Sequence, residues 1–341
     1  MGESNFSLSE SIQIPHGAAI QGRSPCVRCN GNAFAELFEG TDRLLLRTEA
    51  GCRLLECTNC GLIQLDPLLL PMYSPGLCPV WDWWEGVAVF RGRFAESVRR
   101  FATRGRQRFI TRNLQAKQLV LDITGDGGSV ATALRRAGMR VYALQPLLGP
   151  PVRHRHDGDH IPLVCFRPSE ACFAHGSFGA VVALHVLEHL ADPLATLKSL
   201  RALLADDGRL LIQVPNAESW QALLLGERWN GYDIPRHPIS YREDDIVELI
   251  RISGFDVVRR KRFSLRDDPA GLATSLCPWS DPMVRRLRRV NETALSSALK
   301  NAIYGVLTVS ALPLALLEAV AGVGASLLIE ARPVRKRGDG S

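Results

Sequence analysis

The fold is decided by residues 177–215, which read SFGAVVALHVLEHLADPLATLKSLRALLADDGRLLIQVP. The run at 178–184 is apolar and valine-rich, which is typical of a buried strand, and residues 193–208 have the apolar spacing of a helix. Residues 208–214 predict a second strand. A strand, a helix and a strand in this order indicate a βαβ unit with parallel strands.

The same alternation continues on both sides of this stretch. Upstream, we expect strands over 119–123 and 139–144 with a helix over 130–138 between them. Downstream, a helix over 242–254 precedes a strand over 255–263, and a last strand is expected over 325–331. The sequence therefore predicts an α/β fold with a doubly wound sheet.

The composition is that of an ordinary globular chain. Of 341 residues, 46% are hydrophobic and 22% are charged, which excludes a mainly disordered protein. The 41 Lys and Arg residues against 35 Asp and Glu give a net charge of +6, too weak to indicate a nucleic-acid partner by itself. The N-terminus lacks a basic start followed by an apolar core, so we expect no secretory signal and a cytoplasmic location.

Two CxxC pairs predict a metal centre. Cys26 and Cys29 form the first pair, Cys57 and Cys60 form the second, and residues 30–56 lie between them. Four thiolates at about 2.3 Å suit a tetrahedral structural zinc, and two tight turns joined by a hairpin can supply them. The alternatives are a redox dithiol or unrelated buried cysteines, but neither pair opens a helix after a strand as redox pairs usually do. We predict a zinc ribbon.

These features divide the chain into six segments. We expect a flexible tail at 1–24, the zinc ribbon at 25–62, a linker with an arginine-rich helix at 63–117, the α/β core at 118–263, a helical insertion with the last strand at 264–331, and a basic tail at 332–341. The arginine-rich helix is interpreted as a solvated basic face, with an acidic carrier, RNA or a membrane surface as alternative partners.

Residues 302–329 are almost wholly apolar and are longer than the roughly 20 residues that span a membrane. Pro313 and Glu318 interrupt them, and a lone carboxylate is costly within lipid. We therefore expect a buried or surface-lying helix followed by a strand. Peripheral contact with a membrane and a true span remain the alternatives, and nothing in the sequence indicates an oligomeric state.

Several separate motifs carry a resemblance to a known family. They are VLEHLADP at 186–193, Pro215-Asn216, Arg228-Trp229 and Pro235-Arg236-His237, in that order. The chain resembles the class I S-adenosylmethionine-dependent methyltransferases, and more narrowly a bacterial group with an N-terminal zinc ribbon. The resemblance covers about residues 25–263 and the last strand. It implies a Rossmann-like methyltransferase sheet and methyl transfer from S-adenosylmethionine to a small-molecule or carrier-bound acceptor, such as a sugar or a biosynthetic intermediate.

The resemblance also assigns cofactor contacts. The turn after the first core strand would hold the methionine part, the next strand end the ribose, and more distant residues the adenine and the methyl group; these positions are Asp122, Thr124, Gly125, Asp126, Gly128, Gln145, Glu170 and His185. Thr124 and Asp126 stand where the family usually has glycine, and Gln145 stands where it usually has an acidic residue. These departures leave open a catalytically impaired scaffold or binding subunit of the same fold.

The candidate catalytic residues are His189, His237 and Glu188. A histidine titrates near neutrality and suits the removal of a proton from a hydroxyl acceptor. We favour His189, because Glu188 is adjacent and the pair follows a strand end. Alternatively, the two cap the following helix or pair with Arg236, and His237 only packs its loop.

Overall fold

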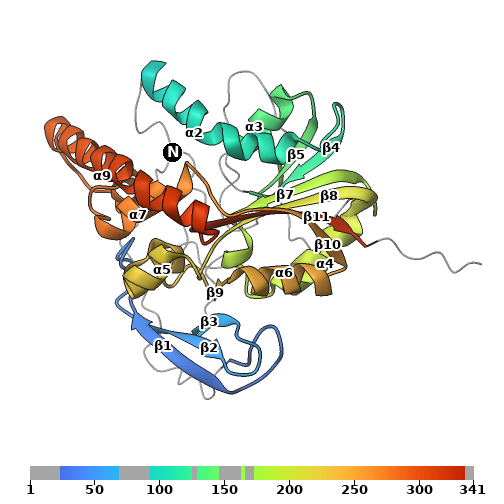
Figure 1. Ribbon diagram of the computed structural model, residues 1–341, viewed down its shortest axis with the longest axis horizontal. Helices are drawn as coiled ribbons and strands as arrows, with labels where there is room; N and C mark the ends of the chain where they lie inside the picture. The colour runs from blue at the N-terminus through green and yellow to red at the C-terminus, as the bar shows by residue number, and fades with distance from the viewer. Residues whose placement is uncertain (1–23, 69–92, 125–128, 146–162, 166–172, 335–341) are drawn as a thin grey trace, which may run out of the picture.

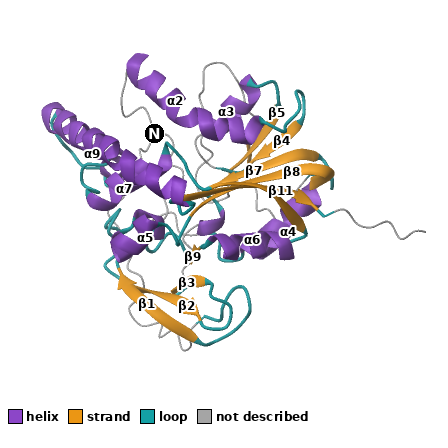
Figure 2. Cartoon of the chain, in the orientation of Figure 1, coloured by secondary structure: helices purple, strands orange, loops and turns teal. Residues whose placement is uncertain are grey.

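The computed structural model describes residues 24–68, 93–124, 129–145, 163–165 and 173–334. These residues form a seven-stranded and a four-stranded sheet (Figures 1 and 2). The seven-stranded sheet has the order β10-β11-β8-β7-β4-β5-β6. Its strands are β4 (Leu119–Asp122), β5 (Arg140–Gln145), β6 (Leu163–Cys165), β7 (Phe178–Leu184), β8 (Leu204–Pro215), β10 (Phe255–Lys261) and β11 (Ser326–Pro333).

The large sheet is doubly wound, as predicted. Strands β4 to β8 run parallel, whereas β11 is antiparallel to β8 and β10. Helix α3 (Ser129–Arg136) links β4 to β5, and α4 (Pro193–Leu203) links β7 to β8. The chain moves outward from β4 to β6 and then returns to the other side of β4 with β7. The strand order reverses between β4 and β7, and doubly wound folds bind their ligands at such a point.

Helices cover both faces of this sheet (Figure 1). Alternate residues of β7 point to opposite faces, so Val181 and Ala183 pack with α4 and α6 (Glu243–Ile252). Ala180 and Val182 pack with α2 (Arg93–Thr111) and α3 on the other face. This double burial explains why β7 is a continuous apolar run.

The remaining helices follow the core or interrupt its later part. They are α5 (Trp220–Leu225), α7 (Asp267–Leu276), α8 (Pro282–Leu287), the long α9 (Ala294–Ala321), and the 3-10 turns η3 (Leu187–His189), η4 (Gly226–Arg228) and η5 (Asn230–Tyr232). Thr293 caps the start of α9, and Gly322 ends it with a φ of 76°. The expected helix and last strand of the apolar stretch are therefore confirmed, although the helix begins before residue 302.

The small sheet belongs to the N-terminal region. It contains β1 (Phe34–Gly40), β2 (Cys52–Cys57), β3 (Ile63–Asp66) and β9 (Ile239–Ser240), all in antiparallel pairs. β9 comes from the second half of the chain and pairs with β3, with Ile63 opposite Ser240. The expected boundary at residue 62 therefore falls inside this sheet, which continues to Asp66 and takes one strand from the core region.

Two ion pairs and a backbone contact fasten the small sheet to α6. Arg28 lies 2.7 Å from Asp245, and Arg242 lies 2.8 Å from Glu56. Arg242 also donates to the carbonyl of Gly61 at 2.9 Å. The first helical turn of α6 is thus held against the turns that carry the cysteines.

One boundary in the core differs from expectation by more than two residues. β8 begins at Leu204 rather than at residue 208, because Leu204 pairs with Phe178 before a register shift in the ladder. The arginine-rich helix is described from Arg93. Residues 69–92, which belong to the expected segment of linker and arginine-rich helix, lie outside the described residues.

Candidate functional site

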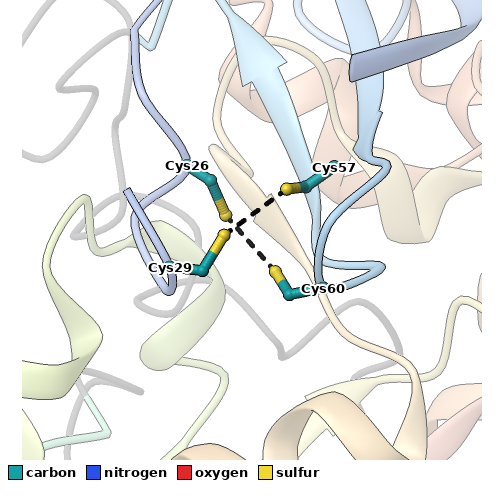
Figure 3. Close-up of side chains that lie close together, drawn as sticks. All are labelled: Cys26, Cys29, Cys57 and Cys60. Carbon is teal, nitrogen blue, oxygen red and sulfur yellow. Dashed lines mark hydrogen bonds between the residues drawn. The ribbon is translucent and has the colours of Figure 1, made fainter. Parts of the chain in front are cut away.

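The four predicted metal ligands converge at one point of the small sheet (Figure 3). The sulfurs of Cys26 and Cys60 are 3.5 Å apart, and those of Cys29 and Cys57 are 3.6 Å apart. All four sulfurs lie within 4.8 Å of one another. A tetrahedron with metal–sulfur bonds of about 2.3 Å has edges of about 3.8 Å, so these thiols are compatible with zinc.

Tight turns create this arrangement. In the first, the amide of Cys26 donates to the carbonyl of Gly31 at 2.9 Å; in the second, Gly61 donates to the carbonyl of Cys57 at 2.7 Å. Gly61 has a φ of 81°, which a glycine adopts without strain. Burial opposes ionisation of Cys29, but hydrogen bonds from the Gly31 amide and neighbouring thiols lower its pKa to about 7. Thiolate is the form that binds metal.

The predicted cofactor turn begins at the point where the strand order reverses. Asp122 ends β4, and its carboxylate accepts a hydrogen bond from the Thr124 amide at 3.0 Å. The Thr124 hydroxyl accepts from the amide of Leu184 at 3.2 Å, which ties the turn to β7. Thr124, at a position where the resemblance leads one to expect glycine, therefore links two strand ends through its hydroxyl.

The other predicted cofactor contacts are described only in part. Gln145 ends β5 and pairs with Cys165 through the backbone. Gly125, Asp126, Gly128 and Glu170 lie outside the described residues, so their contacts with the cofactor stay predictions.

Two of the predicted residues meet directly after β7. His185 follows the strand with a φ of 55°, and its Nδ1 lies 3.0 Å from the Glu188 carboxylate. Glu188 is 1% exposed. Burial raises the pKa of Glu188, but the hydrogen bond from His185 and the nearby histidines lower it overall, so this buried group is a carboxylate.

His189 and His237 form a pair beside Glu188. Their rings meet edge to face with centroids 4.6 Å apart. The His189 Nδ1 lies 2.9 Å from the carbonyl of Arg236, and the His237 Nδ1 lies 2.7 Å from that of Gly231. A carbonyl only accepts, so each Nδ1 carries a proton, and Nε2 is the basic nitrogen of the neutral ring. Burial and the adjacent His237 lower the pKa of His189 to about 4.

Together, Glu188, His189 and His237 bring ligand-capable atoms within 4.8 Å of one another. The set can exchange a proton with a bound hydroxyl, and its composition also suits a cation. The alternative interpretation was that Glu188 and His189 pair with Arg236 or cap the following helix. His189 does contact Arg236, but through the backbone carbonyl and not through the guanidinium. The helix cap after η3 is supplied by Asp192, whose carboxylate accepts from Ala195 at 2.9 Å, and not by Glu188 or His189.

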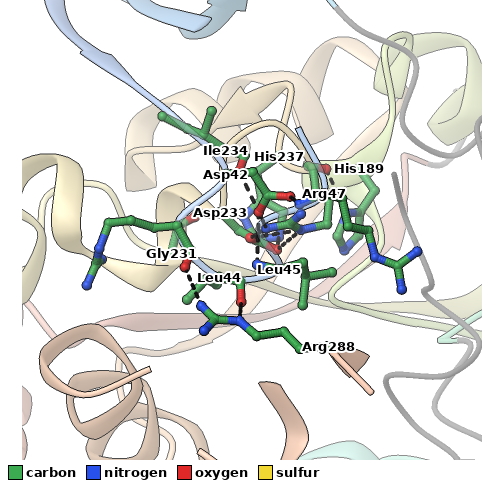
Figure 4. Close-up of polar contacts among 12 residues, drawn as sticks. Asp42, Leu44, Leu45, Arg47, His189, Gly231, Asp233, Ile234, His237 and Arg288 are labelled. Carbon is green, nitrogen blue, oxygen red and sulfur yellow. Dashed lines mark hydrogen bonds and ion pairs between the residues drawn. The ribbon is translucent and has the colours of Figure 1, made fainter. Parts of the chain in front are cut away.

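A buried ion-pair network holds the loop that carries His237 (Figure 4). Arg236 donates to Asp233 at 2.9 and 3.0 Å and to Asp42 at 2.8 Å. Burial alone would lower the pKa of the Arg236 guanidinium, but the two carboxylates raise it overall. Asp42 also accepts from the amides of Leu45 and Arg47, both at 2.9 Å.

Sequence reasoning missed Asp42. No spacing links it to residues 233–237, because it reaches them from the loop between β1 and β2. The sequence offered one indication of such a partner, which is Arg236 within the Pro235-Arg236-His237 motif. If this arginine is buried, it requires carboxylate partners. The partner itself could only be identified from the fold.

The chain is similar to known proteins in sequence. Residues 94–260 match a family model described as a methyltransferase domain. The chain is 30% identical over 187 residues to a ubiquinone biosynthesis O-methyltransferase of Cereibacter sphaeroides, an alignment that covers 52% of this chain and 72% of the relative. A Dinoroseobacter shibae protein of the same name is 26% identical over 203 residues, covering 53% and 79% of the two chains.

Among solved structures, phosphoethanolamine N-methyltransferase 2 of Haemonchus contortus, in complex with S-adenosylmethionine, is 17% identical. It covers 68% of this chain and 53% of its own, with a TM-score of 0.46. The family model and the curated relatives carry the assignment, and the doubly wound sheet accords with it. The chain belongs to the class I S-adenosylmethionine-dependent methyltransferases.

Proposed function

We propose that this methyltransferase acts on a hydroxyl group of a small-molecule or carrier-bound acceptor. The observation that carries the proposal is the orientation of His189, whose Nδ1 proton is held by the Arg236 carbonyl, so that Nε2 is free to accept a proton. The name of the relatives, ubiquinone biosynthesis O-methyltransferase, supports an oxygen acceptor. Hydroxylated ubiquinone precursors and sugars are therefore the first acceptors to test.

The reversal point between β4 and β7 suits the cofactor. Asp122, Thr124 and Gln145, with residues 125–128, would hold its methionine and ribose parts at the carboxyl ends of the strands. S-Adenosylmethionine supplies an electrophilic methyl group when bound. The main task of the protein is to align donor and acceptor, which can contribute about 7–11 kcal/mol.

His189 would remove the acceptor proton. Its imidazole is neutral at physiological pH because its pKa is about 4, so Nε2 is available without prior deprotonation. The carboxylate of Glu188 lies beside it and would stabilise the imidazolium that forms. A positioned base of this kind contributes about 10²–10⁴-fold in rate.

The four cysteines would hold a structural zinc. Cys26, Cys29, Cys57 and Cys60 complete a tetrahedral set, which leaves no open position for a substrate. The metal would therefore act on folding, by joining the two turns that pack against α6.

The proposal is tested by separating cofactor binding from transfer. We expect S-adenosylmethionine to bind the purified chain in calorimetry and to raise its melting temperature. His189→Gln should leave this affinity unchanged and should lower the turnover of labelled methyl transfer to a hydroxylated acceptor by about 10²–10⁴. Neither heat nor a thermal shift at millimolar cofactor would support the impaired scaffold instead.

A peripheral membrane contact is a second part of the proposal. Among the described helices, α9 is long and apolar enough to cross a membrane. Its exposed positions carry no charged residue, and Leu295 and Val320 are 82% and 89% exposed. Glu318, however, is buried and accepts from the amide and side chain of Gln221 at 2.8 and 2.7 Å, which holds the helix along the protein. These contacts favour a helix that lies on a lipid surface over one that spans it.

This part is tested by sedimentation of the intact chain with phosphatidylcholine–phosphatidylglycerol vesicles. The chain should pellet with the vesicles, and Val306→Glu with Val309→Glu should release it, because both positions are exposed on α9. Leu276→Glu, on the exposed end of α7, is the matched control. If the unchanged chain stays in the supernatant, the proposed membrane contact is wrong.

A further inference from the structure

The peptide unit between Arg236 and His237 orients the proposed catalytic base. Its carbonyl, which belongs to Arg236, lies 2.9 Å from Nδ1 of His189. Its amide, which belongs to His237, donates to the carbonyl of Asp233 at 3.1 Å. A peptide unit is planar, so a contact that fixes its amide also fixes the direction of its carbonyl. The orientation of the His189 ring therefore depends on the contacts that hold residues 236 and 237.

The side chain of Arg236 ties this peptide unit to the N-terminal region of the chain. Its Nη2 donates to the Asp42 carboxylate at 2.8 Å, and its Nε donates to Asp233 at 2.9 and 3.0 Å. The side chains of Arg236 and Asp42 are both buried. Separating a buried cation from its carboxylates is costly, because neither charge regains water. The guanidinium, and the backbone that carries it, are thus held between two fixed charges.

Asp42 is itself fixed by the loop between β1 and β2. Its carboxylate accepts from the amides of Leu45 and Arg47, both at 2.9 Å. Leu45 is buried and packs with Leu287 of α8. The carboxylate therefore has a defined position through its own loop, and it can hold Arg236 in place.

Strand β3 holds the residues that follow the peptide unit. The amide of Leu65 donates to the carbonyl of Pro238 at 2.9 Å. In the next two residues, β9 pairs with β3, with Ile63 opposite Ser240. The small sheet thus contacts this segment through the side chain of Arg236 and through the backbone of residues 238–240.

These contacts determine which nitrogen of His189 carries the proton. A neutral imidazole has one N–H group, and a carbonyl that faces Nδ1 selects the form with the proton on that nitrogen. Nε2 then keeps the lone pair that a base needs. We propose that Asp42 is a positioning residue, which acts through Arg236 to hold His189 in the Nδ1–H tautomer. That this tautomer serves as a base rests on the proposed function, whereas the tautomer itself rests on the contacts alone.

The small sheet then has a role beyond the cysteine centre, because one of its loops completes the candidate active site. A purely structural Asp42 would affect the free energy of unfolding and leave the tautomer of the folded chain unchanged. A positioning Asp42 would affect both. The tautomer of His189 is therefore the property to measure.

The test uses the full chain without S-adenosylmethionine, with ¹⁵N in the rings of its eight histidines. Long-range ¹H–¹⁵N spectra show which ring nitrogen carries the proton, and His189→Gln identifies the signals of His189. At pH 7 this ring is neutral, because its pKa is about 4. The unchanged chain should show the Nδ1–H form. Asp42→Asn removes the charge at nearly the same size, and should shift the tautomer equilibrium toward Nε2–H by about tenfold.

The second readout is methyl transfer. Asp42→Asn should lower kcat by about twofold to tenfold, because a smaller fraction of His189 can act as a base. The KM for S-adenosylmethionine should stay unchanged, since none of the proposed cofactor contacts lies in the loop between β1 and β2.

Asp66→Asn is the matched control. Asp66 ends β3 of the same sheet, is also buried, and pairs with Arg53 at 2.5 Å instead of Arg236. This variant should lose stability and keep the His189 signals of the unchanged chain. If Asp42→Asn does not fold, Arg236→Lys replaces it. Lysine keeps a cation between the carboxylates but lacks the planar fork that reaches both, so the second tautomer should appear there as well.

Three results would overturn the proposal. They are an Nε2–H form in the unchanged chain, an unaltered tautomer in a folded Asp42→Asn chain, and an equal shift in Asp66→Asn, which would mean general loosening of the sheet. The tautomer is measured without cofactor or acceptor, so its failure is distinct from failure of the proposed function. If the tautomer follows Asp42 while His189→Gln keeps full turnover, the coupling stands and the proposed base is wrong.

Discussion

The cysteine centre and the histidine pair differ in how the chain assembles them. The four thiols come from two turns whose CxxC spacing already places the sulfurs two by two, and pairing of β1 with β2 brings the turns together. His189 and His237 come from separate loops and are oriented by the carbonyls of Arg236 and Gly231. Local spacing therefore determines the first site, whereas the second depends on contacts between distant segments.

Metal removal should have the largest effect on stability. It should affect the cysteine centre and leave the large sheet folded. Metal binding contributes about 10–16 kcal/mol to the folding of small zinc domains, so stripping the metal should unfold the small sheet. We expect one zinc per chain by mass spectrometry, and loss of amide protection at 52–66 after chelation, with β4 and β7 still protected. Cys57→Ser should reproduce the loss.

Cys277→Ser is the control, because this half-buried thiol lies outside the four-cysteine group. It should keep both metal content and protection. Full protection of 52–66 in the metal-free chain would show that strand pairing alone holds the centre.

Substitution of Arg236 should give the next largest effect. Arg236→Met leaves the buried carboxylates of Asp42 and Asp233 without their cation, which should cost about 3–5 kcal/mol in the free energy of unfolding. Urea unfolding measures this loss. Arg251→Met is the control, since its pair with Glu248 is exposed and should leave the midpoint unchanged. Equal losses in both variants would contradict an anchoring role for Arg236.

The pH dependence of stability should reveal that folding keeps His189 neutral. Its pKa falls from 6.5 to about 4 on folding, so between these values the unfolded chain binds a proton that the folded chain does not. The stability from this group is complete above pH 6.5 and is lost as the pH falls toward 4. His189→Asn should reduce the slope of stability with pH in this interval, measured by urea unfolding.

His175→Asn is the matched control, because His175 is exposed and should leave the slope unchanged. A slope that survives in His189→Asn would assign the acid sensitivity to other groups and would remove the argument for a neutral base.

The smallest effect concerns Gly231, whose carbonyl lies against the His237 Nδ1 and whose backbone lies against the Trp229 ring. Gly231→Ala should cost about 1–3 kcal/mol, because its Cβ would lie 2.3 Å from the Trp229 ring. Gly305→Ala, where nothing lies within 4 Å inside α9, should instead stabilise the chain by up to about 1 kcal/mol. Thermal unfolding compares the two. A neutral Gly231→Ala would mean that the indole can move aside.

The same difference explains what could be predicted from the sequence. The periodicity of residues 119–144, 178–214, 242–263 and 325–331 predicts the strands and helices in these ranges, because each carries its own apolar pattern. The three-residue strand β6 and the short helix α5 were not predicted. The CxxC spacing predicts the four-cysteine group. The two-residue strand β9 leaves no such pattern, and its pairing with β3 depends on the folded positions of residues 63–64 and 239–240.

The candidate active site was predictable only as a set of residues. The motifs indicated Glu188, His189 and His237, and the structure brings these three together. Their orientation was not predictable, since it depends on two backbone carbonyls and on Asp42, a residue more than half the chain away. The role of Thr124 was also hidden, because its hydroxyl is used by a strand that lies 60 positions later.

The placement of β9 has a consequence for the design of chimeras that carry only the large sheet and its helices. This short strand pairs with β3 of the small sheet, yet it lies between Pro238 and Tyr241 and begins two residues after His237. Removal of the N-terminal residues up to the end of the small sheet would leave β9 without its partner β3. It would also leave Arg236 without the Asp42 carboxylate. The two sheets share β9 and the ion pair between Arg236 and Asp42, so a chimera must carry both segments to keep these contacts.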